Sequence, residues 1–443
     1  MSHPRRATAT ASVAAAGILA LALASCSAAG TSGTSGGTAG GIKTGPGVTK
    51  EPCPKAVDKT RGCIYLGVLS DLSEGPFAAL AVPITDAQRA YWKKVNESGG
   101  ISGYEVDIDT YTKDTKYQAA EHAKAYQQIK SNILALAQTL GTVNTAAILP
   151  DMDASDIVGV PASWWSGYHF ADAGKGLILA NGYSYCSEAV VGLDWYSEKN
   201  AKPTSVAAVG YPGDYGGDSA AGVKLWAEAN GVSKVTVVAT GPNQTRGNQD
   251  AVVSALAQAA PDVVVLAVGP AENAEIIGKL VAGGFKGRFM GSAPTWNPAL
   301  LQSAAAPAIS GRYHNMAMIE QWDGTSAAIA AMKSALGGQP PKNNGYVIGW
   351  SMNYPMHAAL VAAAKAGDLT RAGVRKAVNG LVVTWDGMAS KVTYGGNGKS
   401  VADGAMIVSA PDAATPLGLK STGGFYTGTT FAKLPYDKPC STT

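Results

Sequence analysis

Few side chains in this sequence stand at spacings that enzymes use for chemistry. Residues 395–400 (GGNGKS) contain the Gly-Lys-Ser end of a phosphate-binding loop, whose motif also needs a glycine at position 393 and a helix after the serine. Position 393 is Thr393, and residues 401–404 (VADG) are poor helix formers. The segment therefore predicts a hairpin turn and no phosphate site.

Other catalytic and metal-binding patterns are incomplete. The sequence contains no GxSxG nucleophile elbow, HExxH helix or GxGxxG fingerprint. Residues 151–153 (DMD) lack the glycine and terminal glutamate of a calcium loop, the five histidines are scattered, and no CxxC pair occurs. We expect no catalytic residue, no cofactor and no metal, and so a protein that is not an enzyme. A surface hydrolase stays an alternative, because triads assemble from distant positions.

The N-terminus has the pattern of an export signal. Arg5 and Arg6 precede an apolar stretch over residues 13–24, which is too short for a membrane span, and residues 23–26 (LASC) resemble a bacterial lipobox. We predict that residues 1–25 are a lipoprotein signal peptide and that Cys26 carries a diacylglyceryl thioether. A secretory peptide with an incidental cysteine is the alternative. Residues 26–52, rich in Gly, Ser and Thr, would form a flexible tether.

The composition argues against partners that recognise a strongly charged surface. Of 443 residues, 15% are charged and 46% hydrophobic, and the formal net charge is +3. Loss of Arg5 and Arg6 with the leader leaves 33 basic against 32 acidic residues, a net charge of +1. No basic cluster could neutralise phosphates, so we expect no nucleic-acid partner. The length is sufficient for two domains with full cores.

Four cysteines remain besides Cys26, and an even number in an exported chain predicts disulfides. Cys53 and Cys63 flank a short segment before the first predicted strand, which favours a bond between them. Cys186 and Cys440 are then left as the second pair, with all three connectivities still open.

The elements that would position a site begin with a βαβ unit. Residues 64–69 predict an apolar strand and residues 70–76 a polar loop. A helix follows, with Thr85 or Asp86 as its N-cap and Gly99-Gly100 at its end, and residues 104–109 predict a second strand. In open α/β sheets, ligands bind at the carboxyl ends of such strands.

The strand–helix rhythm continues to residue 161 and restarts near residue 180, which predicts a second α/β domain. Late helices and Gly/Thr-rich strands after residue 319 indicate lobes that are discontinuous in sequence. We predict an α/β fold of two Rossmann-like lobes with parallel sheets, joined by a multi-strand hinge. Lobe 1 would comprise residues 53–178 and 319–393. Lobe 2 would comprise residues 179–318 and 394–443, including C-terminal crossing strands.

Four segments, taken in order, resemble one family. The chain is similar to the type I solute-binding proteins of ABC importers, in the branched-chain amino-acid (Leu/Ile/Val) group, over about residues 64–408. The resemblance rests on residues 67–78 (GVLSDLSEGPFA), 95–103 (VNESGGISG), 210–217 (GYPGDYGG) and 385–394 (WDGMASKVTY).

The resemblance implies the type I periplasmic-binding-protein fold, with three crossings between the lobes and a ligand closed between them without catalysis. Carried over by position, the ligand-binding residues would be Phe77, Thr142, Asn144, Thr145, Ser163, Trp164, Tyr211, Tyr215, Gly269, Trp296 and Trp350. Each also has a structural interpretation, since threonines cap helices and buried aromatic rings pack in cores.

One segment departs from the family pattern. Amino-acid binders of this family hold the ligand's α-ammonium with an acidic residue after the strand that here ends at Gly291. Residues 292–296 (SAPTW) contain no carboxylate, and a buried ammonium without a paired acid is costly. An aliphatic amino acid is therefore a doubtful ligand, unless Asp71 or Glu74 supplies the charge from the other lobe.

The resemblance and the leader together imply a lipid-anchored receptor on the outer face of the cytoplasmic membrane. It would capture a small organic solute, such as an amino acid, an amide or an aromatic compound, and deliver it to an ABC permease. A ligand-sensing lipoprotein of the same fold, acting on a signalling partner, is the alternative.

Overall fold

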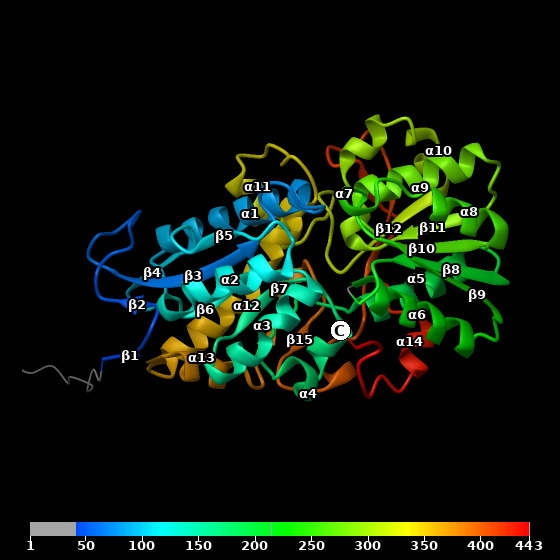
Figure 1. Cartoon of the computed structure of the whole chain (residues 1–443). Helices are drawn as coiled ribbons and strands as arrows, with labels where there is room; N and C mark the ends of the chain where they lie inside the picture. The colour runs from blue at the N-terminus through cyan, green and yellow to red at the C-terminus, as the bar shows by residue number, and fades with distance from the viewer. Residues whose placement is uncertain (1–40, 214, 443) are drawn as a thin grey trace, which may run out of the picture. The chain divides into compact units, whose positions relative to one another are not determined.

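The computed structural model describes residues 41–213 and 215–442. Their strands form two large sheets, each flanked by helices (Figure 1). We call the elements around the six-stranded sheet lobe 1 and those around the seven-stranded sheet lobe 2. Both sheets are largely parallel, as the alternating strand–helix order predicts.

Lobe 1 is organised around β3 (Gly62–Ser70), whose apolar residues are buried on both faces of the sheet. β3 pairs in parallel with β4 (Tyr104–Asp107), β5 (Thr112–Asp114) and β6 (Ala135–Leu140), and antiparallel with β2 (Val48–Thr49). β7 (Gly159–Ala162) pairs with β6 at the sheet edge. The helices of lobe 1 are α1 (Ala78–Glu97), α2 (Ala119–Ile129), α3 (Thr142–Ala154), α11 (Ala327–Ala335), α12 (Gly345–Lys365) and α13 (Arg371–Val378).

Lobe 2 has the strand order β17-β16-β12-β11-β10-β8-β9. β8 (Ser205–Gly210) and β10 (Val263–Ala267) are neighbours within this order, and every residue of β10 is buried. The remaining strands are β9 (Lys234–Ala239), β11 (Arg288–Gly291), β12 (Tyr313–Ala317), β16 (Ile407–Pro411) and β17 (Leu419–Ser421). The helices are α5 (Tyr185–Lys199), α6 (Tyr215–Ala229), α7 (Asn243–Arg246), α8 (Asp250–Ala259), α9 (Pro270–Ala282), α10 (Ala306–Arg312) and α14 (Thr429–Lys433).

The chain crosses between the two sheets more than once. It leaves lobe 1 after β7, passes through the short α4 (Ala171–Gly174) and enters lobe 2 at α5. It returns to lobe 1 after β12, and it reaches lobe 2 again between the small β14 (Val382–Val383)–β15 (Val392–Thr393) pair and β16. These crossings form the hinge that the predicted fold requires.

α1 begins earlier than the sequence predicts. Thr85 and Asp86 do not cap it, because the helix already starts at Ala78 and contains Pro83 in its interior. Pro83 has no N–H for the carbonyl of Ala79, and the side-chain amide of Asn343 donates to that carbonyl instead, at 2.7 Å. A partner from outside the helix therefore makes the internal proline tolerable.

α12 lies along α1 at very short range (Figure 1). A Cβ atom added to Gly345 would lie 2.3 Å from the carbonyl oxygen of Leu80, and one added to Gly349 would lie 2.2 Å from that of Ile84. The two glycines are four residues apart and so share one face of α12. Their missing side chains allow the two helix backbones to touch.

Two disulfides fix segments near the ends of the described chain. Cys53 is bonded to Cys63 at the start of β3, and Cys186 in α5 is bonded to Cys440 near the C-terminus. Before the first disulfide, β1 (Lys43–Thr44) pairs in parallel with β13 (Asp368–Leu369). The N-terminal part of the described chain is thus attached to lobe 1.

The glycine-rich segment at residues 395–400 forms no hairpin. The N–H of Thr393 donates to the carbonyl of Val401 at 3.0 Å, and Gly398–Ser400 is a short 3₁₀ turn inside this reversal. β15 otherwise pairs with β14, so the segment reverses the chain, as a turn does, but a single backbone bond closes it in place of the ladder of the predicted hairpin. No helix follows Ser400 that could aim N–H groups at a phosphate.

Candidate functional site

A small, partly open cavity lies where the carboxyl ends of both sheets meet. Its volume is about 40 Å³, and residues of both lobes line it. The described lining residues are aliphatic, aromatic or small, and none of them is charged: Phe77, Leu80, Ala81, Ile84, Tyr117, Leu140, Gly141, Ala162, Ser163, Trp164, Tyr185, Tyr215, Pro294 and Ile348. This is the position at which open α/β sheets bind ligands.

The loop after β3 carries Phe77 to the cavity. The buried carboxylate of Asp71 accepts hydrogen bonds from the backbone N–H groups of Gly75 and Phe77, both at 2.9 Å. Burial raises the pKa of Asp71 above its ordinary value, while these two donors lower it. The Phe77 ring then packs against Tyr117 at 4.9 Å and, across the cavity, against Tyr215 at 6.1 Å.

Trp164 stands at the first crossing, directly after β7. Its Nε1–H donates to Asn181 at 2.8 Å, and its ring meets Tyr185 edge to face at 5.8 Å. Asn181 in turn donates to Ser351 of α12 at 2.7 Å. A chain of buried hydrogen bonds therefore fixes the orientation of the indole.

Ser163 has the only hydroxyl in the described lining that does not belong to a tyrosine, and its Oγ lies 3.1 Å from the hydroxyl of Tyr168. No histidine or carboxylate lines the described part of the cavity to act as its general base. The arrangement offers no nucleophile–base pair.

Tyr185 and Tyr215 form the wall of lobe 2, with ring centroids 4.9 Å apart. Tyr211 packs behind them, 6.3 Å from Phe77, and does not itself line the cavity. Its hydroxyl donates to Glu272 at 3.1 Å and accepts the N–H of Gly269 at 3.0 Å. Tyr211 and Gly269 thus brace the lobe 2 loops.

A buried acid that the sequence analysis missed lies behind Pro294. Glu188 of α5 accepts the backbone N–H of Ala293 at 3.1 Å and the hydroxyl of Tyr183. Burial raises the pKa of Glu188 to about 7, against the hydrogen bonds that lower it. Residues 292–296, which contain no acid, therefore lie against the carboxyl group of Glu188, which α5 contributes. The sequence offered only a weak signal, because an acid in a first helical turn is common on exposed helices.

The predicted residues at the start of α3 are buried and do not line the cavity. The amide of Asn144 donates to the carbonyl of Leu140 at 3.0 Å, and the hydroxyl of Thr145 lies 2.9 Å from that of Thr139. The Oγ1 of Thr142 is buried without a hydrogen-bond partner. From this segment it is Leu140 and Gly141 that line the cavity.

Two predicted tryptophans lie elsewhere. Trp296 stacks on Tyr313 at 5.7 Å and donates to the carbonyl of Leu417 at 3.0 Å, inside lobe 2. Trp350 packs against Tyr91 of α1 at 5.2 Å and faces an outer groove of lobe 1. Ile348 is the residue of α12 that reaches the cavity.

The acids considered as partners of a ligand ammonium are engaged elsewhere. Asp71 holds its own loop, and the exposed Glu74 pairs with Lys116 at 3.0 Å. Asp214 and the predicted lipidation site Cys26 lie outside the described residues. Among the residues that are described, no three His, Cys, Asp or Glu side chains gather as a metal site, and no helix is long and apolar enough to cross a membrane.

The sequence matches the family model described as "Periplasmic binding protein" over residues 63–415. No curated protein sequence matches it. A solved structure titled as a fatty acid ABC transporter substrate-binding protein from Thermomonospora curvata is similar, with a TM-score of 0.79 at 24% identity over 90% of this chain and 97% of that one.

Two further solved structures share the fold. A branched chain amino acid ABC transporter protein from Thermus thermophilus with bound valine has a TM-score of 0.70 at 19% identity, covering 85% of this chain and 99% of that one. A solute-binding protein from R. palustris in complex with 4-hydroxybenzoate has a TM-score of 0.66 at 14% identity, covering 83% and 97%. At these identities, the likeness concerns the fold alone.

Proposed function

Because the chain belongs to the periplasmic binding protein family, we propose that it is the substrate-binding protein of an ABC importer. It captures a small organic solute between its lobes and delivers it to the permease. Lipidation of Cys26 would hold it on the outer face of the cytoplasmic membrane, with the following residues as a tether.

The observation that carries this proposal is the cavity between the lobes. Phe77 and Trp164 come from loops of lobe 1, and Tyr185, Tyr215 and Pro294 come from lobe 2. A ligand held there touches both lobes, so its binding energy favours their closure. The cavity of about 40 Å³ is far smaller than typical ligand pockets of roughly 300–1,000 Å³. Binding therefore requires the lobes to separate first.

The lining supports an apolar ligand without an ammonium group. An ammonium buried among these side chains would lose its hydration without gaining a described acidic partner, which costs several kcal/mol. An aliphatic or aromatic body gains about 25 cal/mol for each Å² of apolar surface that it buries. Octanoate and 4-hydroxybenzoate have such a body and carry one carboxylate, which the uncharged lining leaves to water or backbone donors, whereas valine adds the disfavoured ammonium.

Calorimetric titration of the chain from residue 27 onward with octanoate, 4-hydroxybenzoate and valine tests this proposal. We expect at least one of the first two to bind more tightly than valine. Phe77→Ala should weaken that binding about 10- to 100-fold, since it removes a buried aromatic contact worth about 1.5–3 kcal/mol. The matched control is Phe285→Ala, which removes a ring of lobe 2 that packs on Phe289 and does not line the cavity.

Two results would contradict the proposed ligand class. One is valine binding as tightly as the better of the two acids. The other is full affinity in the Phe77→Ala variant.

The anchor needs a separate experiment in a bacterial host that processes lipoproteins. Mass spectrometry of the N-terminal peptide should show a diacylglyceryl group on Cys26, and Cys26→Ala should release the protein from the membrane fraction. An unmodified mature N-terminus elsewhere in the chain would contradict the anchor and leave the solute-binding role intact.

A further inference from the structure

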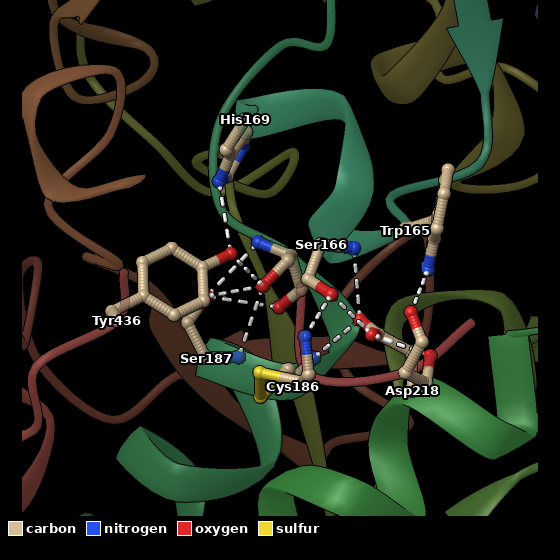
Figure 2. Close-up of a disulfide and its surroundings, with 10 residues drawn as sticks. Trp165, Ser166, His169, Cys186, Ser187, Asp218 and Tyr436 are labelled. Atoms are coloured by element: carbon tan, nitrogen blue, oxygen red, sulfur yellow. Dashed lines mark hydrogen bonds between the residues drawn. A yellow bond between two sulfur atoms is a disulfide. The ribbon is translucent and has the colours of Figure 1, made fainter. Parts of the chain in front are cut away.

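The C-terminal tail is bound to the back of the cavity wall. Cys440 is bonded covalently to Cys186 in the first turn of α5, and residues 436–441 lie along the first crossing between the lobes (Figure 2). The indole N–H of Trp165 donates to the carbonyl of Ser441 at 3.0 Å, and the N–H of Cys440 donates to the hydroxyl of Ser166 at 2.9 Å. We call residues 436–441 the strap.

Tyr436 attaches the other end of the strap. Its hydroxyl lies 3.1 Å from Nδ1 of His169 in the crossing and donates to the hydroxyl of Ser184, the N-cap of α5, at 2.9 Å (Figure 2). The tyrosine is buried among these partners, and burial lowers the pKa of His169 to about 4, so the imidazole is neutral at pH 7. The strap thus contacts both the crossing and the start of lobe 2.

Asp218 of α6 joins the three segments at one carboxylate. It accepts the N–H and the hydroxyl of Ser166 at 3.0 and 2.5 Å, the N–H of Cys186 at 3.0 Å and the hydroxyl of Ser441 at 2.9 Å. Its side chain is fully buried, and these donors satisfy both of its oxygens. Removing the carboxylate would leave buried donors without partners, which is costly.

Three residues of this hydrogen-bonded network, Trp165, Cys186 and Asp218, lie close in sequence to residues of the cavity wall. Trp164 precedes Trp165, Tyr185 precedes Cys186, and Tyr215 lies one helical turn before Asp218. The N–H of Tyr185 also donates directly to the carbonyl of Trp164 at 2.8 Å. The backbone that presents three aromatic rings to the cavity is therefore fixed from behind by the strap.

We propose that the disulfide-bonded strap positions the ligand cavity and that Asp218 is the positioning residue through which it acts. The strap holds the first crossing against lobe 2, so the placement of Trp164, Tyr185 and Tyr215 depends on the Cys186–Cys440 bond. This inference rests on the proposed solute-binding role of the cavity.

A second buried acid provides a matched control. Asp194 of α5 accepts the N–H and hydroxyl of Thr430 at 2.6 and 2.5 Å and the indole N–H of Trp226 at 2.8 Å. It also binds the C-terminal segment, but none of these partners lines the cavity. Cys53–Cys63 is the corresponding control disulfide, since it lies in the N-terminal segment of lobe 1.

The test compares Cys186→Ser/Cys440→Ser and Asp218→Asn with the controls Cys53→Ser/Cys63→Ser and Asp194→Asn. Hydrogen exchange of the peptide over residues 163–169 should become about tenfold faster in the two test variants, the strap disulfide variant and Asp218→Asn. It should stay within about twofold of wild type in the two controls. Octanoate affinity, by calorimetry, should fall about tenfold in the first pair only. Melting temperatures would report any general loss of stability.

Wild-type exchange over residues 163–169 in a folded Cys186→Ser/Cys440→Ser variant would overturn the proposal. If that variant does not fold, Ser441→Ala and Trp165→Phe each remove one hydrogen bond of the strap. Hydrogen exchange over residues 163–169 should then become about threefold faster in each of them. If these also exchange like wild type, the proposal is equally overturned. Exchange needs no ligand, so failure of wild type to bind octanoate would count against the proposed ligand class and not against the strap.

Discussion

The cavity wall of lobe 1 is supported by two helix backbones in contact, whereas the wall of lobe 2 is supported by buried carboxylates. Leu80 and Ile84 of α1 reach the cavity, and their carbonyls touch Gly345 and Gly349 of α12. Glu188 lies behind Pro294, and Asp218 holds the backbone next to Tyr185 and Tyr215. The first support depends on shape and is indifferent to pH, and the second depends on charge and hydrogen bonds.

Methyl groups added between α1 and α12 should disrupt the support of the lobe 1 wall and have the largest effect on stability. Gly345→Ala and Gly349→Ala together should destabilise the protein by about 4 kcal/mol, because each new Cβ meets a carbonyl oxygen and overpacking costs about 1–3 kcal/mol or more per site. Chemical denaturation measures this change.

Gly217 of α6 provides the control for that experiment. A Cβ there meets nothing within 4 Å, so Gly217→Ala should stabilise lobe 2 by about 0.5–1 kcal/mol through helix propensity. Equal effects at the two sites would mean that α1 and α12 do not pack as described.

The contribution of the lobe 2 support to stability should instead depend on pH. Burial raises the pKa of Glu188 to about 7, so its contribution to stability is present below the unfolded value near 4.3 and is lost as the pH rises through 7. Glu188→Gln keeps an acceptor for Ala293 and cannot ionise. It should be similar to wild type at pH 4 and more stable at pH 8, by on the order of 3 kcal/mol.

The comparison must be made between variant and wild type at each pH. Burial lowers the pKa values of His122 and His169 to about 3 and about 4, so they add stability as the pH rises toward 6.5, in the opposite sense. Subtracting the two denaturation profiles removes this contribution. A difference that stays constant from pH 4 to 8 would rule out ionisation of Glu188 as the cause.

The smallest expected effect concerns Pro83 in α1. Asn343→Ala should cost about 1 kcal/mol, because it leaves the carbonyl of Ala79 without its donor. Adding Pro83→Ala should recover only the share due to Ala79, since the new N–H can bond to that carbonyl within the helix, whereas the bond from the N–H of Gly345 to Asn343 stays lost. The double-mutant cycle is read by thermal unfolding, and strictly additive changes would show that the two residues do not act on the same carbonyl.

The sequence predicted helices and strands well where the hydrophobic periodicity agreed with the glycines that mark the ends of elements. β3 and β4 both lie within two residues of their predicted ranges, 64–69 and 104–109. The start of α1 was misplaced because a proline usually ends or begins a helix, and only a contact from Asn343, 260 residues later, makes it tolerable.

The structure places some of the predicted site residues at the cavity and others away from it. Phe77, Trp164 and Tyr215 line the cavity, while the side chains of Asn144 and Thr145 at the start of α3 and of Trp296 bond within their own lobes. Which side of a loop a side chain takes depends on distant partners such as Leu417, which no local pattern contains. The ligand roles of these residues stay predictions until binding is measured.

The attachment of the first described residues has a mechanical consequence. Pulling on residue 41 would load the parallel β1–β13 ladder first and the antiparallel β2–β3 ladder next. Extension would then halt at Cys53, whose bond to Cys63 transfers the force into the central strand of lobe 1. A pull transmitted through residue 41 would therefore act on lobe 1 and not on lobe 2.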